Sequence, residues 1–233
     1  MSLRFNDNNY CYVPYNAALD TLTNAISICT WAYITQSQNL QMFINRATGS
    51  APGNEWWSLN LSGMAPRALI GNTTSVTNVI GATALQINTW YHLAFTFNGT
   101  NIILYQDGAV IGTGTRTMTF SADTSGIVVG ANAQGANDTN IQEFTQGYLE
   151  DMRLYNRVLT PNEIATIMSS NSKDYINNGL LFKLSMDERP ENVVASGALS
   201  VIDSGPLGLH ATPNGSCLYG PNSHTTKRSP SLL

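Results

Sequence analysis

Residues 88–110 constrain the fold more than any other part of the chain. They read NTWYHLAFTFNGTNIILYQDGAV, and every second residue from 93 to 97 is a large apolar one: Leu93, Phe95 and Phe97. Such alternation is typical of a half-buried β-strand. Asn98-Gly99 and Asp107-Gly108 follow strand-like segments, and both dipeptides favour the positive φ angles of tight hairpin turns. The stretch therefore predicts three consecutive antiparallel strands.

Short strand-like segments separated by Asn, Gly and Asp occupy most of the remaining chain, as is typical of a sandwich or jelly roll. We expect strands at about 3–5, 10–13, 25–35, 41–45, 56–61, 68–70, 85–87, 90–97, 102–106, 109–113, 126–131 and 144–155. Residues 160–169 read as the one helix. Thr160 can cap it, Pro161 suits its first position, and Glu163 completes a capping box.

Several of these segments together resemble one family. They are WYHLAFTFNG in the centre, GYLEDMRLYNRVLTPNEIATIM from Gly147, and the opening segments LRFNDNNYCYVP and ISICTWAYI. In order and spacing they resemble laminin G-like domains of the concanavalin A-like lectin/glucanase superfamily, over most of residues 1–168. The resemblance implies an all-β, concanavalin A-like jelly-roll sandwich of two antiparallel sheets with one short helix.

Residues 179–211 carry a second set of family-like phrases in an unexpected place. GLLFKLSMDE resembles the opening strand of a laminin G-like domain, and VIDSGPLGLHA resembles the segment that follows it. Either a second domain is cut short, or the domain is circularly permuted. Because about 50 residues cannot close a second sandwich, we favour permutation. We predict one domain over residues 1–218, which 170–218 completes, and a tail or docking arm over 219–233. Leu180, Phe182, Leu184 and Met186 should then face the core.

Composition and cysteine content limit which binding partners and which cellular compartment we expect for this protein. Only 11% of the 233 residues are charged and the net charge is -4, which argues against nucleic acid or an anionic membrane as partner. No apolar run could cross a bilayer and strand-like sequence begins at once, so we expect no signal peptide and synthesis in the cytoplasm. Cys11, Cys29 and Cys217 are favoured as free thiols, with a Cys11–Cys29 bridge as the alternative.

Glycoside hydrolysis is the first chemistry to consider, because the superfamily includes such enzymes. Retaining hydrolysis needs two carboxyl groups about 5 Å apart, which an E-x-D-x-x-E strand supplies on one face. That pattern is missing, and the adjacent Glu150 and Asp151 should point to opposite faces, one toward solvent and one toward the rim. The histidines at 92, 210 and 224 have no metal-ligand spacing. We predict that the protein is not an enzyme.

The resemblance also implies a calcium site, because laminin G-like domains often hold Ca²⁺ at the sandwich rim. The loop ANAQGANDTN offers Asn137 and Asp138, Asp151 could approach from a neighbouring strand, and Asp203 is a second candidate. Oxygen ligands suit this cation. With so few carboxylates, ordinary Asx turns are the favoured interpretation. We expect a weak or absent calcium site and no other cofactor.

Sugar binding would require exposed aromatic rings beside polar groups. Alternation in WWSLNL places Trp57 with the core leucines and leaves Trp56 as the exposed candidate. Tyr10 and Tyr12 share a face, and Tyr15 follows in a turn region. A protein contact or a half-covered rim position is an alternative role for each of these rings.

Two functions remain. The favoured one is a non-enzymatic structural or binding module, most concretely a bacteriophage virion protein for capsid decoration or association with a fibre. Its partners would be capsid or fibre subunits or copies of itself, and its final location the virion surface or the extracellular space. The alternative is a lectin-like module that recognises glycans, such as those of a cell surface, with or without calcium. The preference for the first function rests on analogy between folds, because no candidate site in the sequence distinguishes the two functions.

Overall fold

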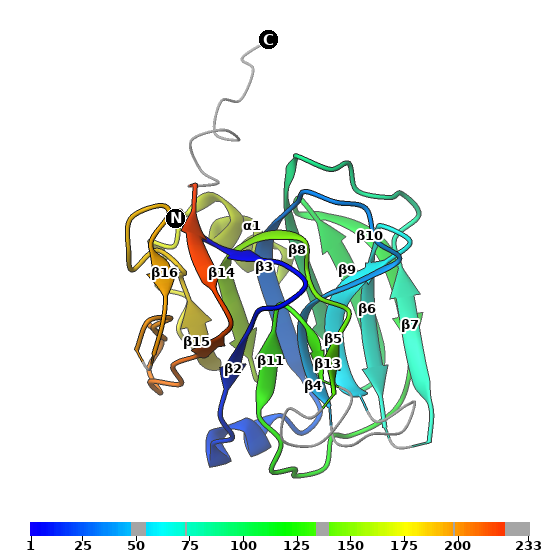
Figure 1. Cartoon of the computed structure of the whole chain (residues 1–233). Helices are drawn as coiled ribbons and strands as arrows, with labels where there is room; N and C mark the ends of the chain where they lie inside the picture. Colours follow the sequence, from blue (N-terminus) through cyan, green and yellow to red (C-terminus); the bar gives the residue numbers. More distant parts are fainter. Residues whose placement is uncertain (48–54, 73, 134–139, 198, 222–233) are drawn as a thin grey trace.

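Two antiparallel sheets pack face to face in the computed structural model, which describes residues 1–47, 55–72, 74–133, 140–197 and 199–221 (Figure 1). The first sheet has the order β10-β9-β8-β3-β14-β1-β18-β16, with β15 also paired to β14. The second has the order β17-β2-β11-β4-β5-β6-β7, and β12 and β13 form a separate hairpin. The predicted all-β, concanavalin A-like jelly-roll sandwich with one short helix is confirmed.

The strands have the following bounds. In the first sheet they are β1 (Ser2–Phe5), β3 (Ile26–Ile34), β8 (Trp90–Phe97), β9 (Asn101–Gln106), β10 (Ala109–Thr115), β14 (Gly147–Tyr155), β15 (Leu180–Leu184), β16 (Val194–Ala195) and β18 (Cys217–Gly220). In the second they are β2 (Tyr10–Val13), β4 (Leu40–Ala47), β5 (Glu55–Ser62), β6 (Ala65–Gly71), β7 (Val76–Ile80), β11 (Ile127–Val129) and β17 (Thr212–Asn214). The hairpin consists of β12 (Asn132–Ala133) and β13 (Ile141–Gln142).

The β8-β9-β10 meander forms as predicted, with two different turns. Asp107 and Gly108 have φ angles of 50° and 81°, as a tight primed turn requires. At the other turn only Gly99 has a positive φ. The Asn98 side chain accepts hydrogen bonds from the backbone N–H groups of Thr100 and Asn101 at 3.0 and 2.7 Å. Asn98 therefore makes an Asx turn, and the expectation of positive φ at this residue was wrong.

β10 is an edge strand of the first sheet and β7 an edge strand of the second, and the two strands lie close together. Gly112 and Gly114 of β10 allow this close approach. A Cβ atom at Gly112 would lie 2.9 Å from Val79 Cγ1, and one at Gly114 would lie 2.6 Å from Val79 Cγ2. The β7 strand replaces the strand predicted at 85–87. Leu85 is buried there without being part of a strand, because burial and strand pairing are separate requirements.

Helix α1 (Pro161–Ser169) begins as the sequence predicts. Thr160 caps it, and Glu163 Oε2 accepts a hydrogen bond from the Thr160 backbone N–H at 2.8 Å, which completes the capping box. Arg157 donates to Glu163, and this hydrogen bond lowers the pKa of Glu163 to about 2. Ile164 and Ile167 bury the inner face of α1 against the first sheet. No helix among the residues that the structure describes has the length and apolarity to cross a membrane.

The C-terminal segment enters the same two sheets as residues 1–170. β15 pairs antiparallel with β14, with Met152 opposite Leu184 and Leu154 opposite Phe182, so the predicted pairing is confirmed. β18 pairs with β1, and β17 pairs with β2. Tyr219 is buried in the core and β18 ends at Gly220, so the sandwich extends past the predicted boundary at 218. Residues 222–233 of the predicted tail lie outside the described residues.

The inward-facing residues of this segment are those predicted, with one exception. Phe182, Leu184 and Met186 join Leu93 and its neighbours in the main core between the sheets. Leu180 instead packs under α1, on the opposite side of the first sheet. Leu154 and Tyr155 of β14 pair with Phe182 and Leu180, so Leu181 of β15 is the extra residue at a register shift. The shift changes the alternation in β15, Leu181 takes the core side, and the prediction for Leu180 was wrong.

Glu150 and Asp151 differ from expectation, because both are buried. A register shift interrupts the pairing of β14 with β3 between Glu150 and Arg153, and Asp151 has a φ of 49°. The Asp151 carboxylate accepts two hydrogen bonds from the Arg153 guanidinium at 2.8 Å, and Arg153 also donates two at 2.7 Å to Asp174. The bulge thus turns Asp151 to an internal partner, and the predicted orientation toward solvent or rim was wrong.

Removal of residues 171–233 should abolish cooperative unfolding, because the loss of β15 and β18 leaves one edge of β14 and one edge of β1 without a paired strand.

Phe182→Ala in the full chain, at a fully buried site, should lower the free energy of unfolding by about 3 to 5 kcal/mol. Urea denaturation measures both effects. Leu207→Ala, at a site that is 42% exposed, is the control and should change stability by less than about 0.5 kcal/mol. A soluble 1–170 fragment that melts cooperatively would contradict this assignment of the C-terminal segment.

Asp174→Asn should destabilise the protein at neutral pH by about 1 to 3 kcal/mol, because it leaves part of the Arg153 guanidinium without a charged partner. Burial alone would raise the pKa of Asp174, but the hydrogen bonds from Arg153 and Ser170 hold it well below its ordinary value. A depressed carboxyl pKa stabilises the fold above the unfolded value of about 3.9 and loses that effect below it.

The stability difference between Asp174→Asn and the natural chain should therefore stay nearly constant from about pH 7 to about 5 and shrink as the pH falls further, through about 3.9 toward about 2. Urea unfolding at several pH values measures this difference. Glu191→Gln, at an exposed site, is the charge-matched control and should show almost no difference. A pH-independent deficit for Asp174→Asn would mean that packing, and not the ion pair, accounts for its effect.

Candidate functional site

A row of polar side chains crosses the outer face of the second sheet, the face away from the core. In β5, Trp57, Leu59 and Leu61 point into the core, so Ser58 and Asn60 must point outward. Strand register places Asn45 of β4 opposite Ser58, and Arg67 of β6 opposite Asn60. Three neighbouring strands thus bring four hydrogen-bonding side chains together on one face.

Hydrogen bonds fix the part of this row that lies on β5 and β6. Asn60 Nδ2 donates to Ser58 Oγ at 2.7 Å, and Arg67 Nε donates to Asn60 Oδ1 at 2.6 Å. Ser58 and Asn60 are buried, whereas Arg67 is only partly so. The sheet and the hydrogen bond to Asn60 therefore orient Arg67, a residue that is partly exposed, and an oriented arginine suits the recognition of a polar ligand.

The β12–β13 hairpin adds a second group of polar side chains over β4. Asn45 Nδ2 donates to Asn132 Oδ1 at 2.6 Å, and Asn132 Nδ2 donates to Glu143 Oε2 at 2.9 Å. The backbone N–H of Met42 donates to the Glu143 carbonyl at 2.9 Å, which joins β4 to this segment. Glu143 is partly exposed and has a φ of 54°. A carboxylate therefore lies at the rim of a face whose floor consists of amides.

One buried atom of the floor has no hydrogen-bond partner among the residues that the structure describes. Asn45 Oδ1 is a fully buried acceptor there, although the amide nitrogen of the same residue is well bonded. A buried acceptor left without a donor costs about 1 to 3 kcal/mol. Because the β12–β13 hairpin lies over β4, a ligand on the outer face does not reach this atom unless the hairpin moves.

Two of the predicted aromatic residues flank this polar floor. Tyr10 and Tyr12 lie on the outer face of β2 and contact a small apolar cluster made of Val128, Ala131, Ala133, Ile141 and Phe144. Both tyrosines are partly exposed. Gly126 allows Tyr12 to lie flat, because a Cβ atom there would overlap the phenol ring. The site thus combines partly exposed aromatic rings with fixed polar groups.

The other two predicted aromatic residues are not joined to this group. Tyr15 lies beyond the end of β2, where its hydroxyl donates to Asp20 at 2.7 Å, and this hydrogen bond raises the pKa of Tyr15. Trp57 is in the core as predicted. Trp56 belongs to β5, but its side chain lies outside the described part of the structure.

The calcium candidates are only partly described. Asn137 and Asp138 lie outside the described residues, so their role stays a prediction. Asp151 has the Arg153 guanidinium as its partner. The carboxylate of Asp203 accepts hydrogen bonds from the backbone N–H groups of Lys183, Gly205 and Leu209 at 2.7 to 2.8 Å. Asp203 therefore stabilises the loop to which it belongs. In the described ranges, no group of three His, Cys, Asp or Glu residues is arranged so that it could hold a metal ion.

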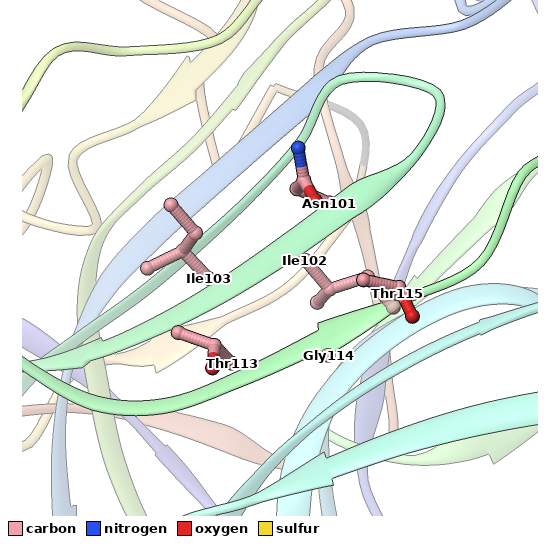
Figure 2. A pocket seen from close by; sticks show the side chains of 6 residues that line it. All are labelled: Asn101, Ile102, Ile103, Thr113, Gly114 and Thr115. Atoms are coloured by element: carbon pink, nitrogen blue, oxygen red, sulfur yellow. The ribbon is translucent and has the colours of Figure 1, made fainter.

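A second surface feature lies on the first sheet. A pocket of about 380 Å³ lies between the neighbouring strands β9 and β10. Its lining residues are labelled in Figure 2: Asn101, Ile102, Ile103, Thr113, Gly114 and Thr115. These residues bring no charge and no aromatic ring. The pocket offers a ligand less chemistry than the outer face of the second sheet.

Sequence reasoning identified Tyr10 and Tyr12 but missed the polar floor. The alternation in WWSLNL already places Ser58 and Asn60 opposite the core residues. Asn45 and Asn132 are 87 positions apart, and no local pattern predicts their contact. Arg67 was missed because a single arginine in a strand usually belongs to a solvated face.

Comparisons with known proteins agree with this architecture. No curated protein matches the sequence. A solved putative carbohydrate binding protein from Bacteroides ovatus aligns with a TM-score of 0.67 at 15% identity, over 95% of this chain and 60% of that one. The chain thus spans less than two thirds of that protein.

Two further solved structures align over shorter parts of this chain. A heptameric SAP-like pentraxin from Limulus polyphemus aligns with a TM-score of 0.57 at 14% identity, over 77% of this chain and 91% of that one. The CBM40 of a Ruminococcus gnavus IT-sialidase, bound to α2,3-sialyllactose, gives 0.55 at 15%, over 71% and 98%. At such identities these structures are similar in fold alone.

The family assignment rests on the sequence. A family model described as the concanavalin A-like lectin/glucanases superfamily matches residues 5–165, which is more than half of the chain. The match includes the strands that form the polar floor and the tyrosines beside it. The chain belongs to the concanavalin A-like lectin/glucanases superfamily.

Proposed function

We propose that this protein binds glycans, without catalysis, through the outer face of the second sheet. The observation that carries the proposal is Arg67, a partly exposed residue that a hydrogen bond to Asn60 holds over a row of buried polar side chains. A glycan presents many hydroxyl oxygens that can accept hydrogen bonds, and an oriented arginine can donate to them. Tyr10 and Tyr12 add apolar ring surface beside them.

The similar proteins support a glycan ligand more than a virion role. The putative carbohydrate binding protein and the CBM40 bound to α2,3-sialyllactose share the fold of this chain. Neither these proteins nor the fold supports the capsid-decoration or fibre-associated role expected from composition. The glycan-binding alternative is therefore the better supported of the two functions.

The absence of catalysis is part of the proposal. Glu150 and Asp151 are the adjacent acidic residues that the sequence offered as the nearest candidates for a catalytic pair, and both are buried within β14. Asp151 is ion-paired with Arg153, so it is poorly placed to attack or protonate a sugar. Binding through the second sheet requires neither residue.

A glycan array probed with the full chain should show binding to a subset of oligosaccharides, with α2,3-sialyllactose included as one probe. Arg67→Ala should weaken binding by roughly tenfold or more, because hydrogen bonds to charged groups contribute about 1.5 to 3 kcal/mol. Isothermal titration with a glycan from the array measures the loss. Tyr12→Ala should also weaken it.

Thr113→Ala, in the pocket between β9 and β10, is the matched control and should bind as the natural chain does. Circular dichroism melts should show that each variant remains folded. Absence of binding to any glycan, or a loss with Thr113→Ala and none with Arg67→Ala, would contradict the proposed site.

Chelation of calcium should leave the melting temperature nearly unchanged. Among the described residues of the site Glu143 is the one carboxylate, and Asp151 is occupied by Arg153. A cation bound only by the folded protein would stabilise it by mass action. Thermal melts with EGTA and with added CaCl₂ measure this effect. A melting temperature that rises with calcium concentration would place calcium in the glycan site.

A further inference from the structure

The two ends of the described chain cross between the sheets next to each other and in opposite directions. The N-terminal arm passes from β1 in the first sheet to β2 in the second, and the C-terminal arm passes from β17 in the second to β18 in the first. β1 pairs with β18 and β2 pairs with β17, both antiparallel. The arms therefore lie side by side at one end of both sheets.

This arrangement brings together two thiols that are far apart in sequence. Cys11 lies in β2 opposite Pro213, and Cys217 begins β18, so the two residues stand on opposite sheets of the same core cluster. Cys217 Sγ lies 3.8 Å from the carbonyl oxygen of Tyr10, the residue before Cys11. Both cysteines are free thiols and fully buried.

The turn before Cys217 is held in place by the N-terminal arm. Gly215 has a φ of 76°, and a Cβ atom there would overlap the carbonyl oxygen of Asn8. Asn9 Nδ2 donates to the Ser216 carbonyl at 3.0 Å. The thiol of Cys217 is thus fixed beside β2 by contacts on both sides of the turn.

The surroundings of Cys11 oppose its ionisation. Burial raises the pKa of Cys11 well above its ordinary value, and the hydrogen bond with Cys217 raises it further. Since the thiolate is the reactive form, the folded protein should oxidise slowly and oxidation should be faster while the arms are apart. Cys29 belongs to the separate cluster under α1.

We propose that Cys11 and Cys217 form an intramolecular disulfide when the chain folds in the presence of a small-molecule disulfide. One thiol loses its proton and attacks the oxidant, giving a mixed disulfide and releasing one small-molecule thiol. The second cysteine, as thiolate, then displaces the other small-molecule thiol and closes the Cys11–Cys217 bond. Two protein thiols are oxidised, and one small-molecule disulfide is reduced to two thiols.

Such a bond would join the first and last parts of the sandwich. The loop it closes contains nearly the whole described chain, and a long loop is where a cross-link restricts the unfolded chain most. The N- and C-terminal arms would then separate only after reduction. This inference is independent of glycan binding.

The test is refolding of the full chain with oxidised glutathione, followed by mass spectrometry and peptide mapping without reductant. The product should be lighter by two hydrogen atoms and should contain a linked pair of peptides with Cys11 and Cys217. Its melting temperature should exceed that of the reduced form by on the order of 10 °C, and reductant should remove the difference.

Cys29→Ala is the matched control, because it removes a buried thiol outside the pair, and it should retain both the link and the shift. Cys11→Ala and Cys217→Ala should lose both, and a melt of each reduced variant establishes that it folds. Three free thiols after oxidative refolding, or a linked pair that includes Cys29, would overturn the proposal.

Discussion

The pairing of β14 on both of its edges is the constraint on which the rest of the sandwich depends. One edge of β14 pairs with β3. The other pairs with β1 over residues 147–149 and with β15 over residues 152–155. A strand from each end of the chain is therefore needed to satisfy one edge, and neither end alone completes the sheet. The C-terminal segment belongs to the domain for this reason, as a circularly permuted chain would require.

The bulge in β14 has a large effect on the charges around it. Asp151 takes up a left-handed backbone conformation, which places both of its carboxylate oxygens against Arg153. The same guanidinium holds Asp174 beyond the end of α1, so one buried cation links a strand to the segment after the helix. Asp151, one of the two adjacent carboxylates considered above for catalysis, is therefore held in a structural ion pair.

Local patterns predicted much of the fold. Alternation at Leu93, Phe95 and Phe97, the Thr160 cap and the pairing of β15 with β14 all follow from residues close in sequence or from known family order. Local patterns did not predict irregular backbone. The register shift that places Leu180 under α1, for example, has no signal in the sequence. The shared outer face of Tyr10 and Tyr12 was predictable, because both residues belong to a strand with clear alternation, while their role as ligand contacts stays a prediction. The contact of Asn45 with the β12–β13 hairpin depends on tertiary packing between distant segments.

We expect the outer face of the second sheet to be a glycan-binding surface, with Arg67 held over a floor of buried polar side chains. NMR titration of isotope-labelled protein with pools of oligosaccharides tests this expectation most directly, because each residue reports separately. Chemical-shift changes are expected at Asn45, Ser58, Asn60, Arg67 and Tyr12. Changes confined to β9 and β10, or no change with any pool, would contradict it.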